Sequence, residues 1–382
     1  MDLPAEANIQ VFEGQNAKGA SLQPAGAQLL SAQVRGRGAA TNVSGRYERE
    51  QRVAVYDDLQ DKEDLPVFKT EVQSEKARTL ITRNQSPDIP FSRSINPYRG
   101  CEHGCSYCYA RPSHAHMGLS PGLDFERQLF AKQNAAAVLM QELSRKGYKP
   151  QPITIGSNTD PYQPIERQQR LTRDLLEVFV ETRHPLVIIT KSALVLRDLD
   201  LLQELAKDNL VKLLVSVTTL DHRLSRALEP RASSPKRRLQ TIEKAHEHGI
   251  PVTAMVAPVI PALTDHEIEE ILAACAAAGA SEAAYILLRL PQEVAGLFRD
   301  WLLRETPDKY RHVMSLLRSM RGGADYDAQW HKRMRGTGPY ADMISKRFSL
   351  ARKRHGLVQR NVSLNCDVFL PPRGGGQQLE LF

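Results

Sequence analysis

Cysteine is scarce in this chain and unevenly placed, because five cysteines occur in 382 residues and three of them fall within eight positions. A disulfide framework uses paired, dispersed cysteines in an oxidising compartment, so this distribution argues against one and favours a reducing compartment with a metal site. Apolar runs of about 18 residues, which a membrane span requires, are lacking. The N-terminus also lacks the basic start and apolar core of a secretory leader. We therefore expect a cytoplasmic protein with no membrane partner.

Aromatic residues make up only 6% of the chain, while 41% of residues are hydrophobic and 25% are charged. This composition is typical of a globular protein with some polar, flexible sequence attached. The length allows one large domain with extensions, or two domains. The formal net charge of +7 favours an anionic partner, although ordinary solvated surfaces show a similar balance.

Between residues 84 and 291, short β-branched or aliphatic runs alternate with longer segments of helical period. The expected strands are Ser94–Tyr98, Ile153–Ile155, Leu186–Thr190, Leu213–Val217, Val252–Ala257 and Ala284–Leu288. The expected helices are Phe125–Arg145, Gln168–Arg183, Leu196–Ala206, Lys236–His248 and Asp265–Ala278. The alternation predicts an α/β fold with a mainly parallel sheet, doubly wound or curled into a barrel. In either case the chemistry lies at the carboxyl ends of the strands.

Four further segments flank this core. Residues 1–45 are rich in Ala, Gly, Gln and Ser and predict disorder. Residues 46–83 form an N-terminal extension of short elements whose type the pattern does not assign. Residues 292–370 are helical in pattern and strongly basic, and residues 371–382 contain a run of three glycines and predict a flexible tail.

Cys101, Cys105 and Cys108 lie on one glycine-bearing loop directly after the first expected strand. Thiolates suit iron–sulfur clusters and zinc, and a four-iron, four-sulfur (4Fe-4S) cluster usually takes four of them. Three thiolates leave one iron open to an external ligand, for which the amino and carboxylate groups of S-adenosylmethionine (SAM) are the candidates. An electron from a partner that reduces the cluster would then break a carbon–sulfur bond and release a 5′-deoxyadenosyl radical.

The cysteine loop has two alternative interpretations, a structural zinc site and three inert buried cysteines. A structural zinc site normally needs four protein ligands, and His103 is the available fourth, but ligation between two bound cysteines would strain so short a loop. Three inert buried cysteines would not need to cluster for packing. The 4Fe-4S cluster is therefore the favoured interpretation.

The cysteine spacing, with an aromatic residue before the third thiol, resembles the radical SAM superfamily, and within it the spore photoproduct lyase-like branch. The similar stretches are Arg93–Arg111, Gly156–Glu166, Thr190–Ser192, Ser216–Thr219, Glu229–Arg231 and Pro258–Pro261, and the similarity spans about residues 81 to 290. The resemblance implies a partial barrel of six β/α units, which agrees with the six expected strands.

The resemblance also implies roles for individual side chains. Tyr107 is expected near the adenine, with a simple packing role as the alternative. Thr159, Lys191 and Ser216 match positions that hold SAM, and Lys191 could instead be a solvated or ion-paired lysine. Tyr107 and Tyr109 match two tyrosines that relay a hydrogen atom in spore photoproduct lyases, and are the expected catalytic residues.

The chain departs from that branch at Ser157, where the lyases carry the cysteine that donates a hydrogen atom. An O–H bond is much stronger than an S–H bond, so Ser157 is a poor donor. Cys366 is a hypothetical replacement, whereas Cys275 has the apolar surroundings of a core residue. Asp160 and Glu166 could bind ribose hydroxyls or cap the next helix, and the sequence does not separate these roles.

The segment from residue 309 to residue 360 carries thirteen Lys or Arg against three Asp, with aromatic residues interspersed. Cations with aromatics suit phosphate contact and base stacking, and they also suit an amphipathic helix pair with solvated charges. The final residues resemble the peptide by which bacterial repair proteins dock on the DNA sliding clamp, through Gln378, Leu379, Leu381 and Phe382. A tail that packs back on the domain is the alternative.

Together these features predict a radical SAM enzyme that acts on nucleic acid, in lesion repair or base modification. A small-molecule or protein substrate is the first alternative. A non-catalytic cluster-bearing adaptor of the sliding clamp is the second.

Overall fold

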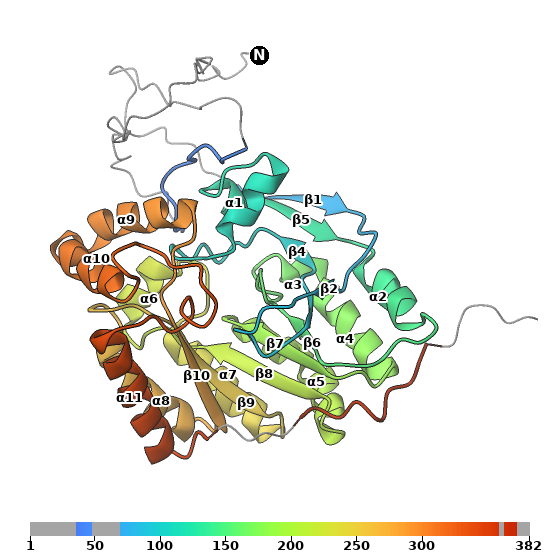
Figure 1. The fold of residues 1–382 in the computed structure, drawn as a ribbon. Coiled ribbons are helices and arrows are strands. Elements are labelled where there is room, and N and C mark those ends of the chain that lie inside the picture. Colours follow the sequence, from blue (N-terminus) through green and yellow to red (C-terminus); the bar gives the residue numbers. More distant parts are fainter. Residues whose placement is uncertain (1–35, 48–68, 359–362, 373–382) are drawn as a thin grey trace, which may run out of the picture.

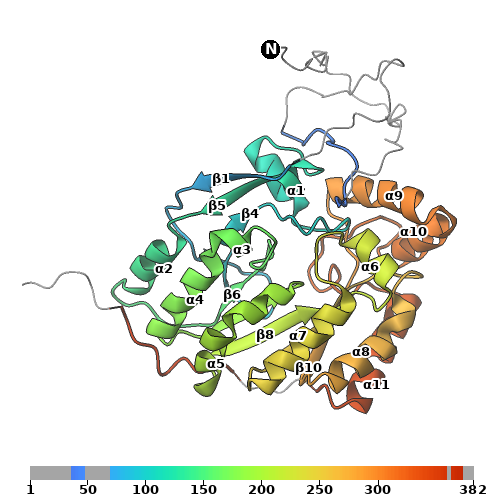
Figure 2. The same ribbon diagram turned by 180° about the vertical axis from the view of Figure 1, so that it is seen from behind.

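The computed structural model describes residues 36–47, 69–358 and 363–372, which form two sheets with helices around them (Figures 1 and 2). The larger sheet has seven strands in the order β10-β9-β8-β7-β6-β3-β2. These are β2 (Thr82–Arg83), β3 (Arg93–Ile95), β6 (Ile153–Ile155), β7 (Leu186–Thr190), β8 (Val211–Ser216), β9 (Val252–Val259) and β10 (Glu282–Leu287). Only the pairing of β2 with β3 is antiparallel. Six parallel strands confirm the expected partial barrel, and its edges β2 and β10 do not pair within the described residues.

Helices form a layer along the outer face of this sheet, and a second group lies near its carboxyl end. The layer contains α2 (Ala135–Leu143), α4 (Leu171–Glu181), α5 (Leu199–Lys207), α7 (Pro235–Glu247), α8 (Ile268–Ala277) and α11 (Pro339–Arg354) (Figures 1 and 2). The others are α1 (Asp124–Arg127), α3 (Glu166–Gln169), α6 (His222–Leu228), α9 (Glu293–Glu305) and α10 (Tyr310–Ser319). None of the helices in the described ranges is long and apolar enough to cross a bilayer.

The helix expected over Phe125–Arg145 is wrong in its first half. Gln128–Lys132 form strand β5, which pairs with β1 (Glu71–Glu75) and β4 (Tyr98–Arg99) in the smaller sheet. Leu129 and Ala131 are buried while their neighbours are partly exposed, so the segment has the two-residue period of a strand. A short alternation of apolar and polar residues inside an apolar stretch resembles a helical turn in sequence. The segment is a strand because it pairs with β1.

Residues 36–47 are ordered, so the expected disordered segment 1–45 extends too far; residues 1–35 lie outside the described part. The backbone nitrogens of Gly38 and Ala39 donate to the carboxylate of Glu126, at 3.0 and 2.8 Å. The side-chain amide of Asn42 donates to the carboxylate of Asp124 at 2.8 Å and accepts from the backbone nitrogen of Asp124 at 3.0 Å. Fixed hydrogen bonds to two buried carboxylates hold this glycine-rich stretch against α1, despite its lack of large apolar side chains.

The C-terminal segment 363–372 runs along the amino ends of the strands. The backbone nitrogens of Asn365 and Leu370 donate to Asn209 and Thr182, which precede β8 and β7 respectively. Cys366 therefore lies at the opposite end of the sheet from the cysteine loop. The hypothesis that Cys366 replaces the missing hydrogen donor is wrong for this reason.

His184, at the same amino end, predicts an acid sensitivity of the fold. Its imidazole is buried, Nδ1 bonds to the Pro185 carbonyl and Nε2 to the Tyr148 hydroxyl, and Phe369 packs edge-on against it. Burial lowers its pKa to about 4 from the ordinary 6.5. The unfolded chain therefore binds a proton that the folded chain excludes, and stability falls as the pH drops through this window.

We expect the free energy of unfolding to fall by about 2 kcal/mol from this residue between about pH 7.5 and about pH 5. Urea unfolding of the wild type and of His184→Gln at both pH values measures it. The variant should lose correspondingly less stability on acidification. Identical pH dependence in the two proteins would remove His184 as the cause.

Candidate active site

A cavity of about 180 Å³ opens at the carboxyl ends of the parallel strands. The loop after β3 contributes the three clustered cysteines to its wall. Each of the other five parallel strands contributes residues near, at or beyond its carboxyl end: Gly156 and Asn158 after β6, Thr190 and Lys191 at β7, Ser216 at β8, Ala257 and Pro258 near the end of β9, and Leu287 and Arg289 at β10. Ligand sites lie at this end of parallel sheets because the strand-following loops meet there.

The cysteine loop is held in one conformation by backbone geometry and a buried ion pair. Gly100 and Gly104 adopt positive φ angles of 73° and 65°, and a Cβ at Gly104 would lie 2.8 Å from the carboxylate of Glu126. Arg111 is fully buried, donates twice to the carbonyl of Cys105 and pairs with Glu126. The shape of the loop is therefore set by contacts within the chain itself.

The three thiols fit a cluster better than a single ion. Cys101 and Cys105 are buried, Cys108 is partly buried, and all three line the cavity. Within the described residues, no three His, Cys, Asp or Glu side chains converge as a single-ion site requires. His103, the fourth ligand that zinc would use, instead places Nδ1 3.3 Å from Asp160.

The electrostatic surroundings of the thiols also favour a cluster. Burial, followed by the charge of Asp160, raises the pKa of Cys101 well above its ordinary value, and burial with Glu229 raises that of Cys105. Thiolates are thus stable here only when a positively charged centre compensates them. A three-thiol donor set around one cavity has the chemistry that a 4Fe-4S cluster with one open iron requires.

Tyr107 is fixed by a buried network beneath the loop. Its hydroxyl donates to Glu229, which also accepts from Thr218 at 2.8 Å and from the guanidinium of Arg238. Arg238 in turn donates to the carbonyl of Ser216 at 3.1 Å. The network joins the cysteine loop to the end of β8, so Tyr107 and Ser216 occupy fixed places in the cavity wall.

Lys191 lies in the same wall, with Nζ 6.0 Å from the centre of the Tyr107 ring. Burial lowers the pKa of this ammonium, but Glu229 and Cys105 together raise it above the ordinary value. The structure therefore brings together four of the expected residues, namely Tyr107, Tyr109, Lys191 and Ser216.

Thr159 does not line this cavity. Its hydroxyl donates to the carbonyl of Tyr98 at 3.0 Å, and its side chain is buried. Its neighbour Asp160 lines the cavity but uses its carboxylate internally, accepting from Thr190 and from the backbone nitrogen of Lys191, both at 2.7 Å. Asp160 thus connects the loops that follow β6 and β7.

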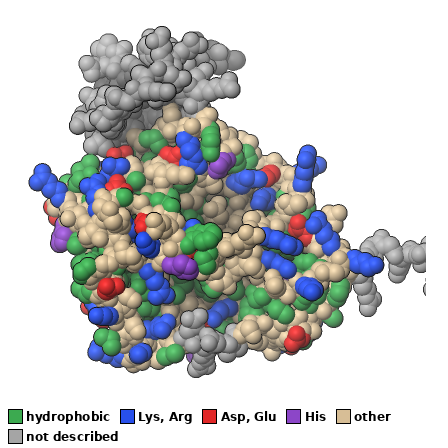
Figure 3. Space-filling model, viewed as in Figure 1, with side chains coloured by type: hydrophobic (Ala, Val, Ile, Leu, Met, Phe, Trp, Pro, Cys, Tyr) green, Lys and Arg blue, Asp and Glu red, His purple; other side chains and the backbone are tan. Residues whose placement is uncertain are grey.

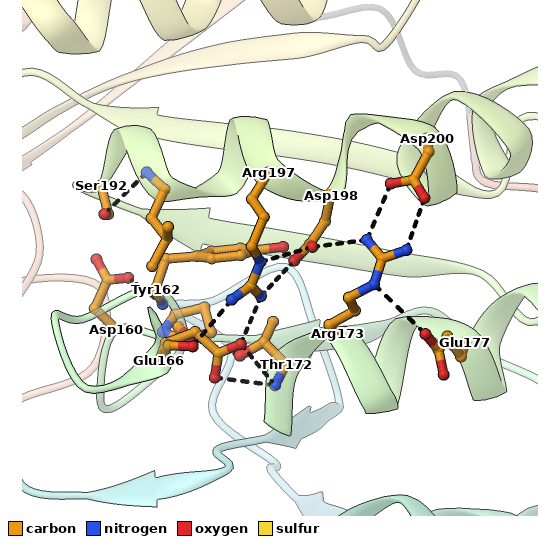
Figure 4. A network of polar contacts seen from close by, with 12 residues as sticks. Asp160, Tyr162, Glu166, Thr172, Arg173, Glu177, Ser192, Arg197, Asp198 and Asp200 are labelled. Carbon is orange, nitrogen blue, oxygen red and sulfur yellow. Dashed lines mark hydrogen bonds and ion pairs between the residues drawn. The ribbon is translucent and has the colours of Figure 1, made fainter. Parts of the chain in front are cut away.

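Glu166 does not line the cavity. It belongs to the network of polar contacts drawn in Figure 4. Its carboxylate accepts from the backbone nitrogen of Thr172 in the first turn of α4, which makes it a cap of that helix. It also pairs with Arg197 at 2.7 Å, and Arg197 and Arg173 both pair with Asp198. Of the two roles left open for Glu166, the structure favours the cap.

Tyr109 and Arg289 both line the cavity and lie against each other. Tyr109 is 42% exposed and donates its hydroxyl to the carbonyl of Ser157. The Arg289 guanidinium lies 3.9 Å from the centre of the Tyr109 ring. The Ser157 hydroxyl accepts from Asn96 at 3.2 Å, so the residue at the donor-cysteine position is engaged in a loop contact.

Three residues of the site were not predicted from the sequence. Arg289 lines the cavity, whereas Glu229 and Arg238 lie in the buried network that holds Tyr107. Glu229 stands in a stretch that supported the family resemblance, yet nothing local marks its pairing with Arg238. Arg289 follows an expected strand directly, and its position at a strand end was the available signal.

Comparisons with known proteins agree with this geometry. A sequence profile described as the radical SAM superfamily matches residues 95–275. An uncharacterized protein of Mycobacterium tuberculosis is 38% identical over 230 residues, which cover 59% of this chain and 68% of the relative. A protein of Pseudomonas phage M6 named radical SAM Nalpha-GlyT isomerase is 28% identical over 46% of this chain and 35% of its own.

Among solved structures, a spore photoproduct lyase complexed with dinucleoside spore photoproduct superposes with a TM-score of 0.53. The superposition covers 74% of this chain and 79% of the lyase, at 16% sequence identity. The two proteins share a fold.

Proposed function

We propose that this chain, which belongs to the radical SAM superfamily and is a radical SAM enzyme, acts on nucleic acid in base modification or lesion repair. Cys101, Cys105 and Cys108 would hold the cluster, which together with SAM supplies a 5′-deoxyadenosyl radical. Lys191 would bind the methionyl carboxylate through a charge-assisted hydrogen bond.

The remaining contacts to SAM follow from the cavity wall. The Tyr107 ring would lie against the adenine, since its hydroxyl is already held by Glu229 and only its ring is available. Ser216 would donate its hydroxyl from the end of β8. For Thr159 we propose that it supports the loop after β6 instead of binding SAM, because its hydroxyl donates to the carbonyl of Tyr98.

One observation carries the nucleic-acid substrate: the basic C-terminal region exposes cations that form no ion pair with carboxylates of the described residues. They are Lys309, Arg311, Lys332, Arg335, Lys346, Lys353 and Arg354. An amphipathic helix pair stabilised by salt bridges would pair most of them. Lys and Arg clearly outnumber Asp and Glu on the face shown in Figure 3. Unpaired surface cations of one sign suit a phosphate backbone.

The residue that returns a hydrogen atom at the end of the radical reaction would differ from the cysteine of the lyase branch. No cysteine other than the three clustered ones lines the cavity within the described residues. Tyr109 exposes its ring to the cavity and lies against Arg289, so we propose Tyr109 as the residue that relays a hydrogen atom. Tyr107 stays a second candidate whose hydroxyl is bound to Glu229.

Two protein partners complete the proposal. A reduced electron-transfer protein would supply the cluster with an electron. The sliding clamp would bind the residues from Gln378 to Phe382, which lie outside the described part of the chain. That peptide pattern, with two leucines and a terminal phenylalanine, suits an apolar groove.

Deuterium transfer tests the substrate directly. The reconstituted, reduced protein is incubated with SAM and uniformly deuterated DNA or RNA oligonucleotides, and released 5′-deoxyadenosine is analysed by mass spectrometry. We expect deuterium in the 5′-deoxyadenosine, because the radical abstracts a hydrogen atom from its substrate. Unlabelled 5′-deoxyadenosine with both nucleic acids, under conditions where they bind, would contradict the proposal and favour a small-molecule or protein substrate.

A further inference from the structure

Residues 326–336, the bridge segment, cross the open side of the partial barrel. On the β10 side, the carbonyl of Met334 accepts from the backbone nitrogen of Leu287 at 2.9 Å. On the opposite side, Asp88 in the loop between β2 and β3 accepts from the backbone nitrogen of His331 at 2.6 Å and pairs with Arg333. The segment therefore joins the two sheet edges that do not pair with each other.

The bridge segment also adjoins the cavity. Leu287, to which Met334 is bonded, lines the cavity wall. Arg321 donates to the carbonyl of Lys332 at 2.7 Å and to that of Leu288, another lining residue, at 2.8 Å. The bridge segment therefore lies directly beside the cavity wall on the open side of the barrel.

The outward side of the bridge segment carries an exposed aromatic ring among cations. Trp330 is 58% exposed, and the following His331, Lys332 and Arg335 are exposed as well. Asp327, the one acidic residue in the sequence of the bridge segment, accepts from the backbone nitrogen of Gln329 at 2.8 Å, and no acidic residue occurs from position 328 to position 336. A large ring held in solvent by a segment anchored on both sides is pre-organised for a ligand, since little conformational freedom remains to be lost on binding.

We propose that Trp330 stacks on a base of single-stranded or locally unpaired nucleic acid at the entrance to the cavity, with Lys332 and Arg335 contacting the flanking phosphates. This inference rests on the proposed function and names the form of its substrate. Aromatic rings bind bases of any sequence through their faces, and adjacent cations bind the backbone. Cores of protein interfaces, in contrast, are depleted in lysine, and the bridge segment places Lys332 two residues from the ring.

The chain carries its own reporter for this inference, because it contains two tryptophans. Trp301 is 1% exposed, and its indole nitrogen donates to the Ala227 carbonyl at 3.0 Å. Fluorescence quenching by an added oligonucleotide therefore reports on Trp330. We expect a short labelled oligothymidylate to bind the full chain at low salt, measured by anisotropy, and to quench the exposed tryptophan.

Trp330→Phe should remove that quenching, and Trp330→Ala should weaken binding about tenfold or more. Lys332→Gln should lower the slope of log Kd against log salt by about one. Leu350→Ala, which removes an exposed apolar side chain on α11, is the control and should bind like the wild type.

Two failures are distinguishable. If the oligonucleotide binds, yet the quenching is absent and Trp330→Ala binds equally well, the inference is overturned while the proposed function stands. If neither single-stranded nor duplex oligonucleotide binds at low salt, the proposed function fails and the inference fails with it.

Discussion

Replacing Cys105 with alanine is expected to abolish the release of 5′-deoxyadenosine from SAM. The variant leaves two thiols, Cys101 and Cys108, at the cavity, and burial raises the pKa of the Cys101 thiol well above its ordinary value. Such a site needs every available thiolate to hold iron against the cost of desolvation. Iron and sulfide content after anaerobic reconstitution, together with 5′-deoxyadenosine release, measures the effect. Equivalent losses are expected for Cys101→Ala and Cys108→Ala.

Two other cysteines provide matched controls for that experiment. Cys366→Ala changes a thiol at the amino end of the sheet, and should retain the wild-type cluster and the wild-type rate. Cys275→Ala changes a thiol that is buried in the core, where burial raises its pKa to about 12. It should keep the cluster with a small loss of stability. Full iron content and cleavage in Cys105→Ala would remove the ligand assignment.

Five of the six parallel strands could be predicted because each is a short run rich in β-branched or aliphatic residues, and burial on both faces makes such runs visible. The strand expected over Ser94–Tyr98 is instead divided between β3, which carries the polar Arg93 and Ser94, and β4 of the smaller sheet. The family resemblance indicated Lys191 and Ser216, and both stand at or directly after a strand end, where the loops at the carboxyl ends converge. The local signal failed at Gln128–Lys132, where the pairing with β1 depends on a partner more than fifty residues away.

The sequence predicted only those parts of the site whose residues lie close together along the chain. Three cysteines within eight positions are enough to predict a metal centre. Glu229 and Arg238 are ordinary surface-type residues in sequence, and only the fold buries them together beneath Tyr107. Similarly, nothing in the sequence around Trp330 shows that His331 and Arg333 anchor it to Asp88, 243 and 245 residues away. Long-range pairings of this kind appear only when the chain is folded.

Glu229→Gln is expected to lower the free energy of unfolding by about 3–5 kcal/mol, because it leaves the guanidinium of Arg238 buried without a charge partner. Burial raises the pKa of Glu229, but Arg238 and Lys191 outweigh it and hold that pKa at about 2. The folded-state pKa lies below the ordinary 4.5, so this carboxylate stabilises the fold above about pH 4.5 and loses its effect as the pH falls toward 2. At neutral pH the full effect of the substitution is therefore present.

Urea unfolding at neutral pH of Glu229→Gln, Arg238→Met and the double variant measures this pair. The double variant should be destabilised by less than the sum of the single variants, since neither charge is then left alone. Glu247→Gln, which breaks an exposed pair with Lys244, is the control and should unfold like the wild type. Additive losses, or a Glu229→Gln variant as stable as its control, would show that the charges under Tyr107 are independent. Because the Tyr107 hydroxyl donates to Glu229, the single variant should also bind SAM more weakly, and equilibrium dialysis separates this effect from unfolding.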